Sequence, residues 1–206
     1  MPPVTQARLN LLEAMLDMMW ERSYAAISVD AICERAGVKK GSFYHFFSSK
    51  AALAAAALEH RWDHEMKGKL EQIFAPEVPP LARLQRQMEH CYRKTVACRA
   101  EHGRVLGCPY FNIASETTGV EPELADMARG ILRRFQGFLE QALREAVERG
   151  DLTLADPAAS AACLFSMMEG CATQARIHDD PELVRQLSPT VGRMLGVEFP
   201  AVEAAV

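Results

Sequence analysis

The chain has 206 residues, of which 49% are hydrophobic and 24% are charged, and its formal net charge is −4. This length suits a small domain joined to a larger one. No apolar run is long enough to span a bilayer and no signal peptide is recognisable, so we expect a cytoplasmic protein. The acidic balance argues against nucleic acid, but residues 1–61 carry seven Lys/Arg against six Asp/Glu, so the acidity lies in the remainder.

Residues 28–50 predict two short helices joined by a tight turn. Ser28 can supply the N-cap oxygen of the first helix, in which Ile32 follows Val29 at a helical spacing. Gly37 can adopt the left-handed conformation that ends this helix. The second helix is predicted to bury three phenylalanines, Phe43, Phe46 and Phe47.

The opposite face of the second helix is polar, basic and aromatic, which suits the major groove of DNA. Lys40 and Ser42 are candidates for contacts with base edges, and Ser28 and Lys50 for contacts with backbone phosphates. The predicted DNA-binding residues are Ser28, Lys39, Lys40, Gly41, Ser42, Tyr44, His45 and Lys50. The alternative for the lysines is an ordinary solvated surface.

Residues 5–65 resemble the N-terminal domain of the TetR/AcrR family of transcriptional regulators. The matching features are an opening amphipathic helix, Tyr24, Ser28-Val29-Asp30, Ala36-Gly37-Val38, the string from Lys40 to Phe47, and Ser49-Lys50 before Leu53. Ser23 departs from the glycine usual in the family, so we expect either strain or a rearrangement at the end of the first helix. Ala51 replaces a common acidic residue, which removes a favourable interaction with the dipole of its helix.

Beyond residue 50 nearly all of the chain is predicted to be helical, which gives an all-α fold of about nine helices. Proline and glycine residues divide this part of the chain. The expected helices are 51–74, 81–100, 109–117, 122–149, 157–178 and 181–195. The resemblance implies a helix-turn-helix domain at 1–50, a connecting helix at 51–74, and a ligand-sensing and dimerisation domain at 75–206.

The segment 161–177 is apolar or small almost all round. A helix of this kind needs cover on two sides, which its own core and a partner subunit would supply. The alternative is a central helix of a monomer. Because the resemblance implies dimerisation through the last two helices, we expect a homodimer on a palindromic double-stranded DNA operator.

The second half of the chain mixes aromatic residues and methionines with a few polar groups, which suits a medium-sized apolar ligand. The alternative is that each of these residues simply belongs to the core. The candidate ligand-binding residues are Met88, Cys91, Tyr92, Thr95, Cys108, Phe111, Asn112, Phe135, Phe138, Leu164, Met168 and Cys171.

Cys108 differs from the other five cysteines because it precedes Pro109, a residue suited to the first turn of a helix. A helix N-terminus favours the thiolate, and His102 and Arg104 are near in sequence. The surrounding segment resembles one branch of the TetR family in which some members sense electrophiles or oxidants. We therefore expect a repressor that is released from its operator by a small-molecule inducer, or by thiol modification at Cys108. The alternative for Cys108 is a small buried thiol.

A competing interpretation is a metal-dependent hydrolase, because His60 and His64 lie one helical turn apart with Asp63 between them. A metal-sensor site formed by Cys91, Cys98 and His102 is a related alternative. A helical histidine pair is more often a solvated face, and no convincing third ligand follows His64. We therefore predict a regulator that is not an enzyme and has no cofactor.

Overall fold

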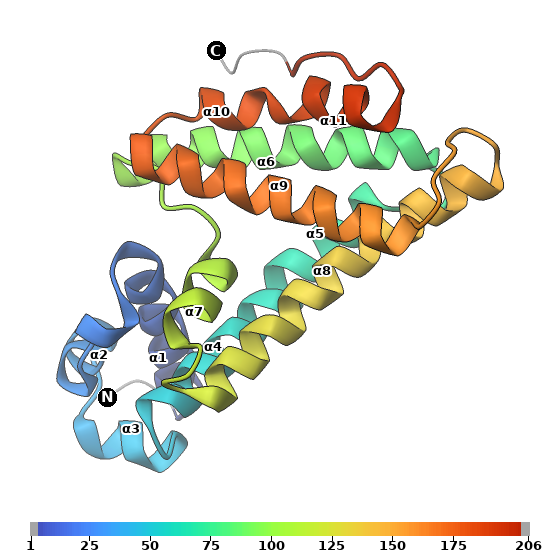
Figure 1. The fold of residues 1–206 in the computed structure, drawn as a ribbon. Coiled ribbons are helices and arrows are strands. Elements are labelled where there is room, and N and C mark those ends of the chain that lie inside the picture. The colour runs from blue at the N-terminus through green and yellow to red at the C-terminus, as the bar shows by residue number, and fades with distance from the viewer. Residues whose placement is uncertain (1–3, 203–206) are drawn as a thin grey trace. The chain divides into compact units, whose positions relative to one another are not determined.

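The computed structural model describes residues 4–202, in which all regular secondary structure is helical and no β-strand occurs, and so confirms the all-α fold class (Figure 1). The chain divides into two compact units. Unit 1 extends to Gly68 and adds Pro109–Leu132, whereas unit 2 combines Lys69–Cys108 with the chain from Arg133 onward. The sequence-based division at residue 75 did not anticipate that Pro109–Leu132 would group with the N-terminal helices. The functional boundaries stay predictions.

Unit 1 is built on α1, α2, α3 and α4, with α7 and the first part of α8 (Figure 1). These elements are α1 (Val4–Glu21), the 3₁₀ turn η1 (Tyr24–Ala26), α2 (Val29–Ala36), α3 (Lys40–Phe46), α4 (Lys50–Arg61), α7 (Pro109–Thr117) and α8 (Pro122–Glu148). Helix α1 packs against α2, α3, α4 and α7. Leu11, Ile32, Phe43 and Leu53 are fully buried and form part of its core.

The connecting helix is not uniformly α-helical. Helix α4 passes into a π-helical turn, η2 (Trp62–Met66), and then into α5 (Lys67–Ile73). The predicted helix at 51–74 is therefore helical over almost its whole length but changes its hydrogen-bonding pattern midway. Such π-helical turns are rare and occur frequently at functional sites.

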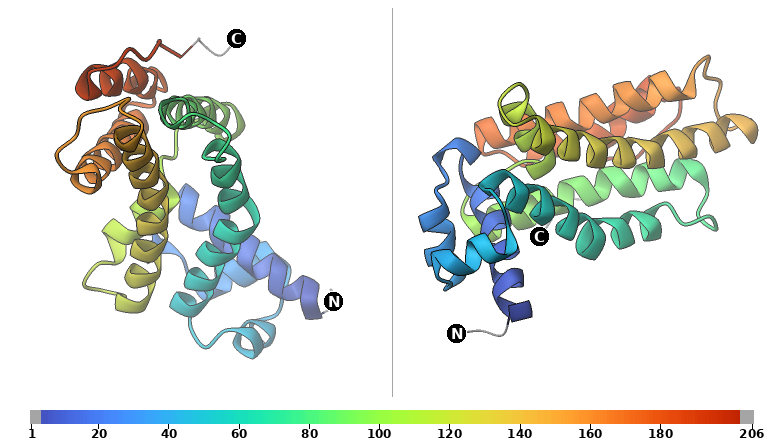
Figure 2. Two further views of the ribbon diagram at one scale, coloured as in Figure 1. Left: turned by 90° about the vertical axis from the view of Figure 1, so that its right-hand side faces the viewer. Right: turned by 90° about the horizontal axis from the view of Figure 1, so that it is seen from below.

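Unit 2 consists of α5 in part, the rest of α8, and four further helices: α6 (Pro80–His102), α9 (Pro157–His178), α10 (Glu182–Arg185) and α11 (Leu187–Leu195). Helices α10 and α11 pack against α6 and α9, and run alongside α6 (Figure 1); Figure 2 gives two further views. The predicted helix at 181–195 is thus divided in two. Pro189 provides a physical reason, because it has no N–H to donate to the carbonyl of Arg185 four residues earlier.

Two close contacts hold unit 2 together. Arg83 is buried, and its guanidinium donates to the carbonyls of Val78 and Pro76 (2.7 and 2.9 Å) and to Glu145 (2.6 Å). Gly192 lies against the following segment, because a Cβ atom there would be 2.7 Å from the backbone nitrogen of Phe199. Across residues 4–202, no helix is long and apolar enough to cross a membrane.

Candidate functional site

The helix-turn-helix in unit 1 forms as its sequence predicts. The Ser28 hydroxyl accepts a hydrogen bond from the Ala31 N–H at 3.1 Å, so Ser28 is the N-cap of α2. Gly37 ends this helix with φ 65° and ψ 31°, and its N–H bonds to the carbonyls of Cys33 and Glu34. This left-handed conformation is accessible to glycine without steric cost, so the turn depends on Gly37.

Helix α3 buries two of the three predicted phenylalanines. Phe43 is fully buried and Phe47 is 6% exposed, but Phe46 is only half-buried, which corrects the sequence-based prediction. The reason is that α3 ends at Phe46, and Phe47 has an extended conformation with φ −136° and ψ 130°. In this extended conformation Phe47, rather than Phe46, packs against Phe43, with 6.3 Å between the ring centres.

Six of the predicted DNA-binding residues lie together at α3 and its N-terminus. Lys39, Lys40, Gly41 and His45 are exposed, and Ser42 is half-exposed. The Tyr44 side chain is 56% exposed, which is unusual for a large aromatic residue, and its ring meets the buried Phe43 ring edge-on at 5.0 Å. We call these residues the α3 outer face. It combines positive charge, a hydroxyl group and an aromatic ring.

An ion pair on the α3 outer face was not predicted. The Lys40 ammonium lies 2.8 Å from the Asp30 carboxylate of α2, and both side chains are largely exposed. The hydrogen bond to Asp30 raises the pKa of Lys40 above its ordinary value. Residues 35–50 contain no acidic residue, so the sequence around α3 did not indicate this pairing; Asp30 reaches Lys40 only through the fold.

Lys50 has an internal role that its sequence position did not suggest. Its ammonium donates to the carbonyls of Tyr24 and Ile27, both at 2.9 Å, and lies 4.0 Å from the centre of the Tyr24 ring. Burial lowers the pKa of Lys50 below its ordinary value. These contacts tie the start of α4 to the turn after α1, so Lys50 is not included among the proposed DNA contacts below.

Glu116 on α7 is the residue of unit 1 that the sequence analysis missed as an interaction partner. Its carboxylate accepts hydrogen bonds from the Ser23 hydroxyl and from the N–H groups of Tyr24 (3.0 Å) and Ala25 (2.9 Å). Burial would raise the pKa of Glu116, but these hydrogen bonds, with Lys50 nearby, hold it below its ordinary value. We call Glu116, Ser23, Tyr24, Ala25 and Lys50 the turn clamp.

The turn clamp also corrects the prediction of strain at Ser23. Ser23 has φ −60° and ψ 137°, a region that any residue can adopt. Its side chain therefore costs no backbone strain, and its hydroxyl supplies a hydrogen bond that glycine lacks.

The predicted ligand-binding residues fall in both units. Phe111 and Asn112 belong to unit 1, and the other ten belong to unit 2. Within unit 2, Met88, Leu164 and Met168 are buried on α6 and α9. Two aromatic pairs add to this core, Phe74 with Phe138 at 5.4 Å and Phe135 with Phe165 at 5.7 Å between ring centres.

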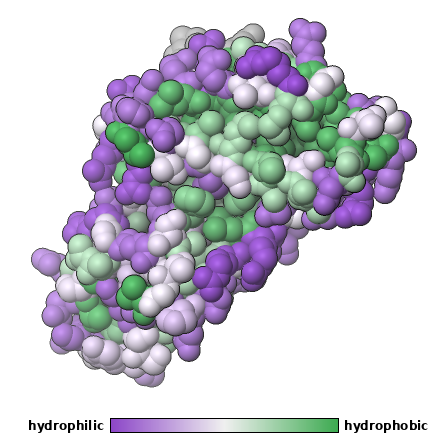
Figure 3. Space-filling view, in the orientation of Figure 1, coloured by the Kyte–Doolittle hydropathy of each residue, from purple (hydrophilic) through white to green (hydrophobic). Residues whose placement is uncertain are grey.

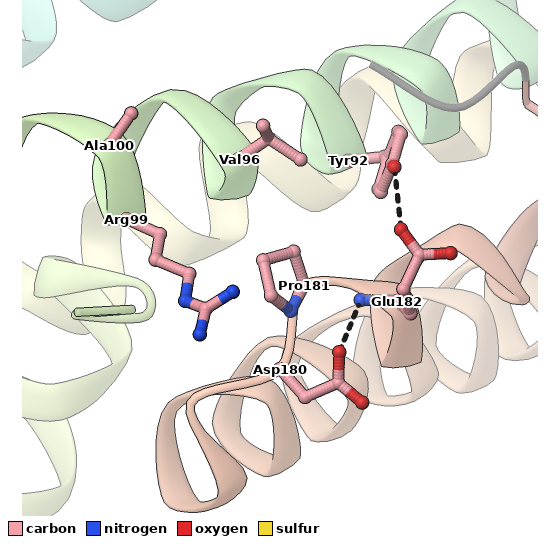
Figure 4. Close-up of a pocket in the computed structure, with 7 residues that line it drawn as sticks. All are labelled: Tyr92, Val96, Arg99, Ala100, Asp180, Pro181 and Glu182. Atoms are coloured by element: carbon pink, nitrogen blue, oxygen red, sulfur yellow. Dashed lines mark hydrogen bonds between the residues drawn. The ribbon is translucent and has the colours of Figure 1, made fainter. Parts of the chain in front are cut away.

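Two of the candidate polar groups are already engaged. The Thr95 hydroxyl donates to the Cys91 carbonyl at 2.8 Å, within its own helix. The Tyr92 hydroxyl donates to the Glu182 carboxylate of α10 at 2.7 Å. Tyr92 lines an open groove of about 400 Å³, together with Val96, Arg99, Ala100, Asp180, Pro181 and Glu182 (Figure 4). Its hydroxyl therefore holds α6 to α10.

A buried polar cluster in unit 2 contains two residues that the sequence analysis did not select, Gln87 and Glu169. The Gln87 side-chain N–H donates to the Cys91 sulfur at 3.4 Å, and the Cys108 thiol donates to the Glu169 carboxylate. Burial raises the pKa of Glu169 to about 7 and that of Cys91 to about 12, and it also raises the pKa of Cys171. A sequence signal was available, because Gln87 and Glu169 are polar residues on the apolar faces of their helices.

The metal-binding alternatives receive no support from the geometry. The rings of His60 and His64 are 4.1 Å apart between centres, but His64 Nδ1 is 2.9 Å from the His60 carbonyl oxygen and so faces its own helix. In the described part of the chain, no group of three or more His, Cys, Asp or Glu residues could hold a metal ion. This applies equally to the grouping of Cys91, Cys98 and His102.

Comparison with known proteins agrees with this geometry. Residues 11–57 match the family model of bacterial regulatory proteins of the tetR family, and residues 80–191 match the tetracyclin repressor-like C-terminal domain. The transcriptional regulator AcuR of Cereibacter sphaeroides is 31% identical over 194 residues, which cover 93% of this chain and 86% of AcuR. The transcriptional repressor NemR of Escherichia coli K12 is 26% identical over 175 residues, covering 82% of this chain and 84% of NemR.

Solved structures show the same fold. The regulatory protein TetR from Rhodobacter sphaeroides superposes with a TM-score of 0.79 at 31% identity, over 91% of this chain and 97% of that one. The reduced form of Escherichia coli NemR gives a TM-score of 0.75 at 22% identity, over 96% and 100%. These relatives are regulators and not enzymes, which sets aside the hydrolase alternative. The chain belongs to the TetR family of bacterial DNA-binding transcriptional regulators.

Proposed function

We propose that this protein is a homodimeric repressor that binds a palindromic operator through α3 and releases it when a small molecule binds unit 2. The observation that carries the DNA-binding half is the α3 outer face, where an exposed tyrosine stands beside two exposed lysines. Phosphate contacts from Lys39 and Tyr44 would fix the helix on the duplex, and Ser42 and Lys40 would contact base edges. The relative NemR is described as a repressor, which supports repression rather than activation as the proposed effect on transcription.

Dimerisation is supported by the uncovered side of α9. One side of this helix is buried in unit 2 by Leu164, Phe165 and Met168. The opposite side is exposed and consists mostly of small or apolar residues, Ala159, Cys163, Ser166, Gly170, Gln174 and Ile177. The Ile177 side chain is 65% exposed, which is a large value for an apolar residue. Figure 3 shows hydrophobic residues gathered on the face of unit 2 where α9 lies. A second copy would cover this surface with the same helix, as in an isologous interface.

The chain crosses between the units at three points, one of them within helix α8 at Leu132–Arg133, and we propose that the signal travels along the other two. One is the helix from α4 through η2 to α5, whose π-helical turn ends two residues before the boundary at Gly68. The other is the Cys108–Pro109 peptide bond, which joins unit 2 to the helix that carries Glu116. Ligand binding would favour dimers whose α3 helices are wrongly spaced for successive major grooves.

The test of this function uses the DNA upstream of the protein's own gene. We expect the wild-type dimer to bind a palindrome there, measured by fluorescence anisotropy, and Tyr44→Ala to lose at least ten-fold in affinity while staying dimeric. Lys69→Ala, in unit 2, is the control and should bind like the wild type. Equal affinity of wild type and Tyr44→Ala would contradict the assignment of α3 as the recognition helix.

A further inference from the structure

Two buried acceptor atoms in unit 2 have no hydrogen-bond partner among residues 4–202. They are Oε1 of Gln87, whose side chain is completely buried, and Oε2 of Glu169, whose side chain is 8% exposed. Buried polar atoms are normally satisfied, and an unsatisfied acceptor costs stability because its hydration is lost without replacement. Each such atom is therefore a position where a partner from outside the chain, such as an ordered water or a ligand, can bind.

The two acceptors belong to one cluster. The Gln87 amide donates to the Cys91 sulfur at 3.4 Å, and Cys91 in turn lies within electrostatic range of Glu169 and Cys171. The Cys108 thiol donates to the Glu169 carboxylate. Helices α6 and α9 and the residue before α7 thus converge on a site that is rich in acceptors and has few donors. We call Gln87, Cys91, Cys108, Glu169 and Cys171 the acceptor cluster.

Charge distinguishes the kinds of ligand that could bind here. Burial raises the pKa of Glu169, and the hydrogen bond from Cys108 lowers it in part. Among residues 4–202, the one charged side chain that acts on this carboxylate is Lys94, which also lowers the pKa. The neighbouring thiols of Cys91 and Cys171 are neutral, since burial raises the pKa of both. A carboxylate or phosphate would meet unpaired oxygen atoms and a like charge, whereas a cation would meet a carboxylate that lacks a full counter-charge.

We propose that the acceptor cluster binds the protonated amino group of an apolar amine, with Glu169 and Gln87 as its hydrogen-bond acceptors. An alkylammonium group has three N–H donors and no acceptor, so a single group can satisfy both oxygen atoms. Met88 and Met168, which neighbour Gln87 and Glu169 in the sequence, are buried and apolar, and apolar surroundings suit the hydrocarbon part of such a molecule. This proposal rests on the proposed function, because it specifies the chemical class of the inducer.

The test compares three six-carbon probes, hexylammonium, 1-hexanol and hexanoate, by isothermal titration calorimetry on the full-length protein without DNA. We expect hexylammonium to bind at least ten-fold more tightly than the other two. Since Glu169 is about half protonated at pH 7, binding of the cation should release about half a proton, and this release should vanish by about pH 9. Titrations in two buffers of different ionisation enthalpy measure it directly.

Variants locate the binding site. Glu169→Gln should remove both the preference for hexylammonium and the proton release, and Gln87→Leu should weaken binding without abolishing the release. Glu148→Gln, an exposed carboxylate of unit 2, should change neither. If Glu169→Gln does not fold, the wild type still tests the amine proposal, through its preference for hexylammonium and through the proton release on binding.

Failure of hexylammonium to bind the wild type, or binding unchanged in Glu169→Gln, would overturn the proposal. Measuring release of the operator distinguishes a failure of the amine proposal from a failure of the proposed function. If hexanol or hexanoate binds and releases the operator while hexylammonium does neither, the amine proposal fails and the ligand-responsive repressor stands. If hexylammonium binds at Glu169 but no ligand releases DNA, the amine site stands and the proposed regulation fails.

Discussion

Ser23 donates a hydrogen bond to the carboxylate of Glu116, which lies 93 residues later in the chain. The same carboxylate accepts from the N–H groups of Tyr24 and Ala25, so one side chain of α7 satisfies three donors at the turn after α1. Through this contact α7 fixes the turn from which the chain enters the helix-turn-helix. Helix α7 is thereby part of the DNA-binding unit, although it is distant in sequence.

The first prediction concerns this contact. Ser23→Gly and Glu116→Gln should each lower the free energy of unfolding by about 1 kcal/mol, because both groups are partly solvated and a charge-assisted hydrogen bond is lost. The double variant should lose less than the sum of the two, since the residues interact directly. Urea unfolding measures these values, and the exposed Glu123→Gln on α8 is the control. Additive losses would show that Ser23 and Glu116 act independently.

The pH dependence of the same contact has a defined direction. The pKa of Glu116 is lowered in the folded state, so its contribution to stability is present above the unfolded-state pKa and is lost as the pH falls through the folded-state value. Glu116→Gln should therefore flatten part of the fall in stability below about pH 4.5. If the stability of Glu116→Gln falls at acidic pH as steeply as that of the wild type, the assigned pKa shift is contradicted.

The second prediction concerns the ion pair on α3. Lys40→Ala should weaken operator binding and reduce the slope of log affinity against log salt by up to about one per subunit, because a base contact is lost together with a positive charge close to the phosphates. Asp30→Ala should have the opposite effect on affinity, since Asp30 competes with DNA for the Lys40 ammonium. Fluorescence anisotropy at several salt concentrations measures both. Weaker binding in both variants would show that Asp30 helps to orient Lys40.

The third prediction concerns assembly. Gly170 lies on the exposed side of α9, and a Cβ atom there would meet nothing within 4 Å, so Gly170→Arg leaves the subunit core intact. In a dimer it would bury an unpaired charge, which should dissociate the subunits and reduce operator affinity sharply.

Gly137→Arg on α8 is the matched control, because Gly137 is also exposed with open space around it. Sedimentation velocity of both variants and the wild type gives the assembly state. A monomeric wild type, or a Gly170→Arg variant that stays dimeric, would exclude this side of α9 as the interface.

The fourth prediction separates ligand binding from thiol chemistry. If a reversible ligand is the inducer, Cys108→Ser should be released from DNA nearly as well as the wild type, and Phe138→Trp should impair release. We expect this outcome because burial raises the pKa of the neighbouring Cys91 and Cys171 thiols, and the Cys108 thiol is already engaged in a hydrogen bond to Glu169. Treatment with N-ethylmaleimide should be compared in Cys108→Ser and Cys163→Ser, since Cys163 is exposed. Release of the wild type and of Cys163→Ser by the reagent, but not of Cys108→Ser, would favour thiol sensing.

The fifth prediction concerns the buried carboxyl of Glu169. Its pKa is raised to about 7 in the folded state, so the folded protein binds more protons than the unfolded chain between about pH 4.5 and 7. Stability should therefore fall as the pH rises through this window, by up to roughly 3 kcal/mol. Glu169→Gln should remove this part of the slope, as measured by urea unfolding at pH 5 and pH 8 and at one protein concentration. The same slope in both proteins would contradict the pKa shift.

Local patterns were sufficient to predict the helix-turn-helix. The Ser28 N-cap and the Gly37 turn act on neighbouring backbone atoms, so their consequences could be derived without knowledge of the rest of the fold. The same holds for Pro109 and Pro157, which open helices α7 and α9 at the predicted positions. Phe46 was predicted incorrectly because a helical spacing does not show where the helix ends.

Only the tertiary structure decided which distant groups meet. Lys50 appeared to be a surface lysine until the carbonyls of Tyr24 and Ile27 were placed around its ammonium. Glu116 and Glu169 are both glutamates on helices, yet hydrogen bonds hold the pKa of one below its ordinary value and burial raises that of the other. The sequence by itself determined the local backbone and the family, because these depend on residues close together in the chain. The charge state and the partner of each polar group depend on solvent exposure and on distances between separate helices, which the fold alone establishes.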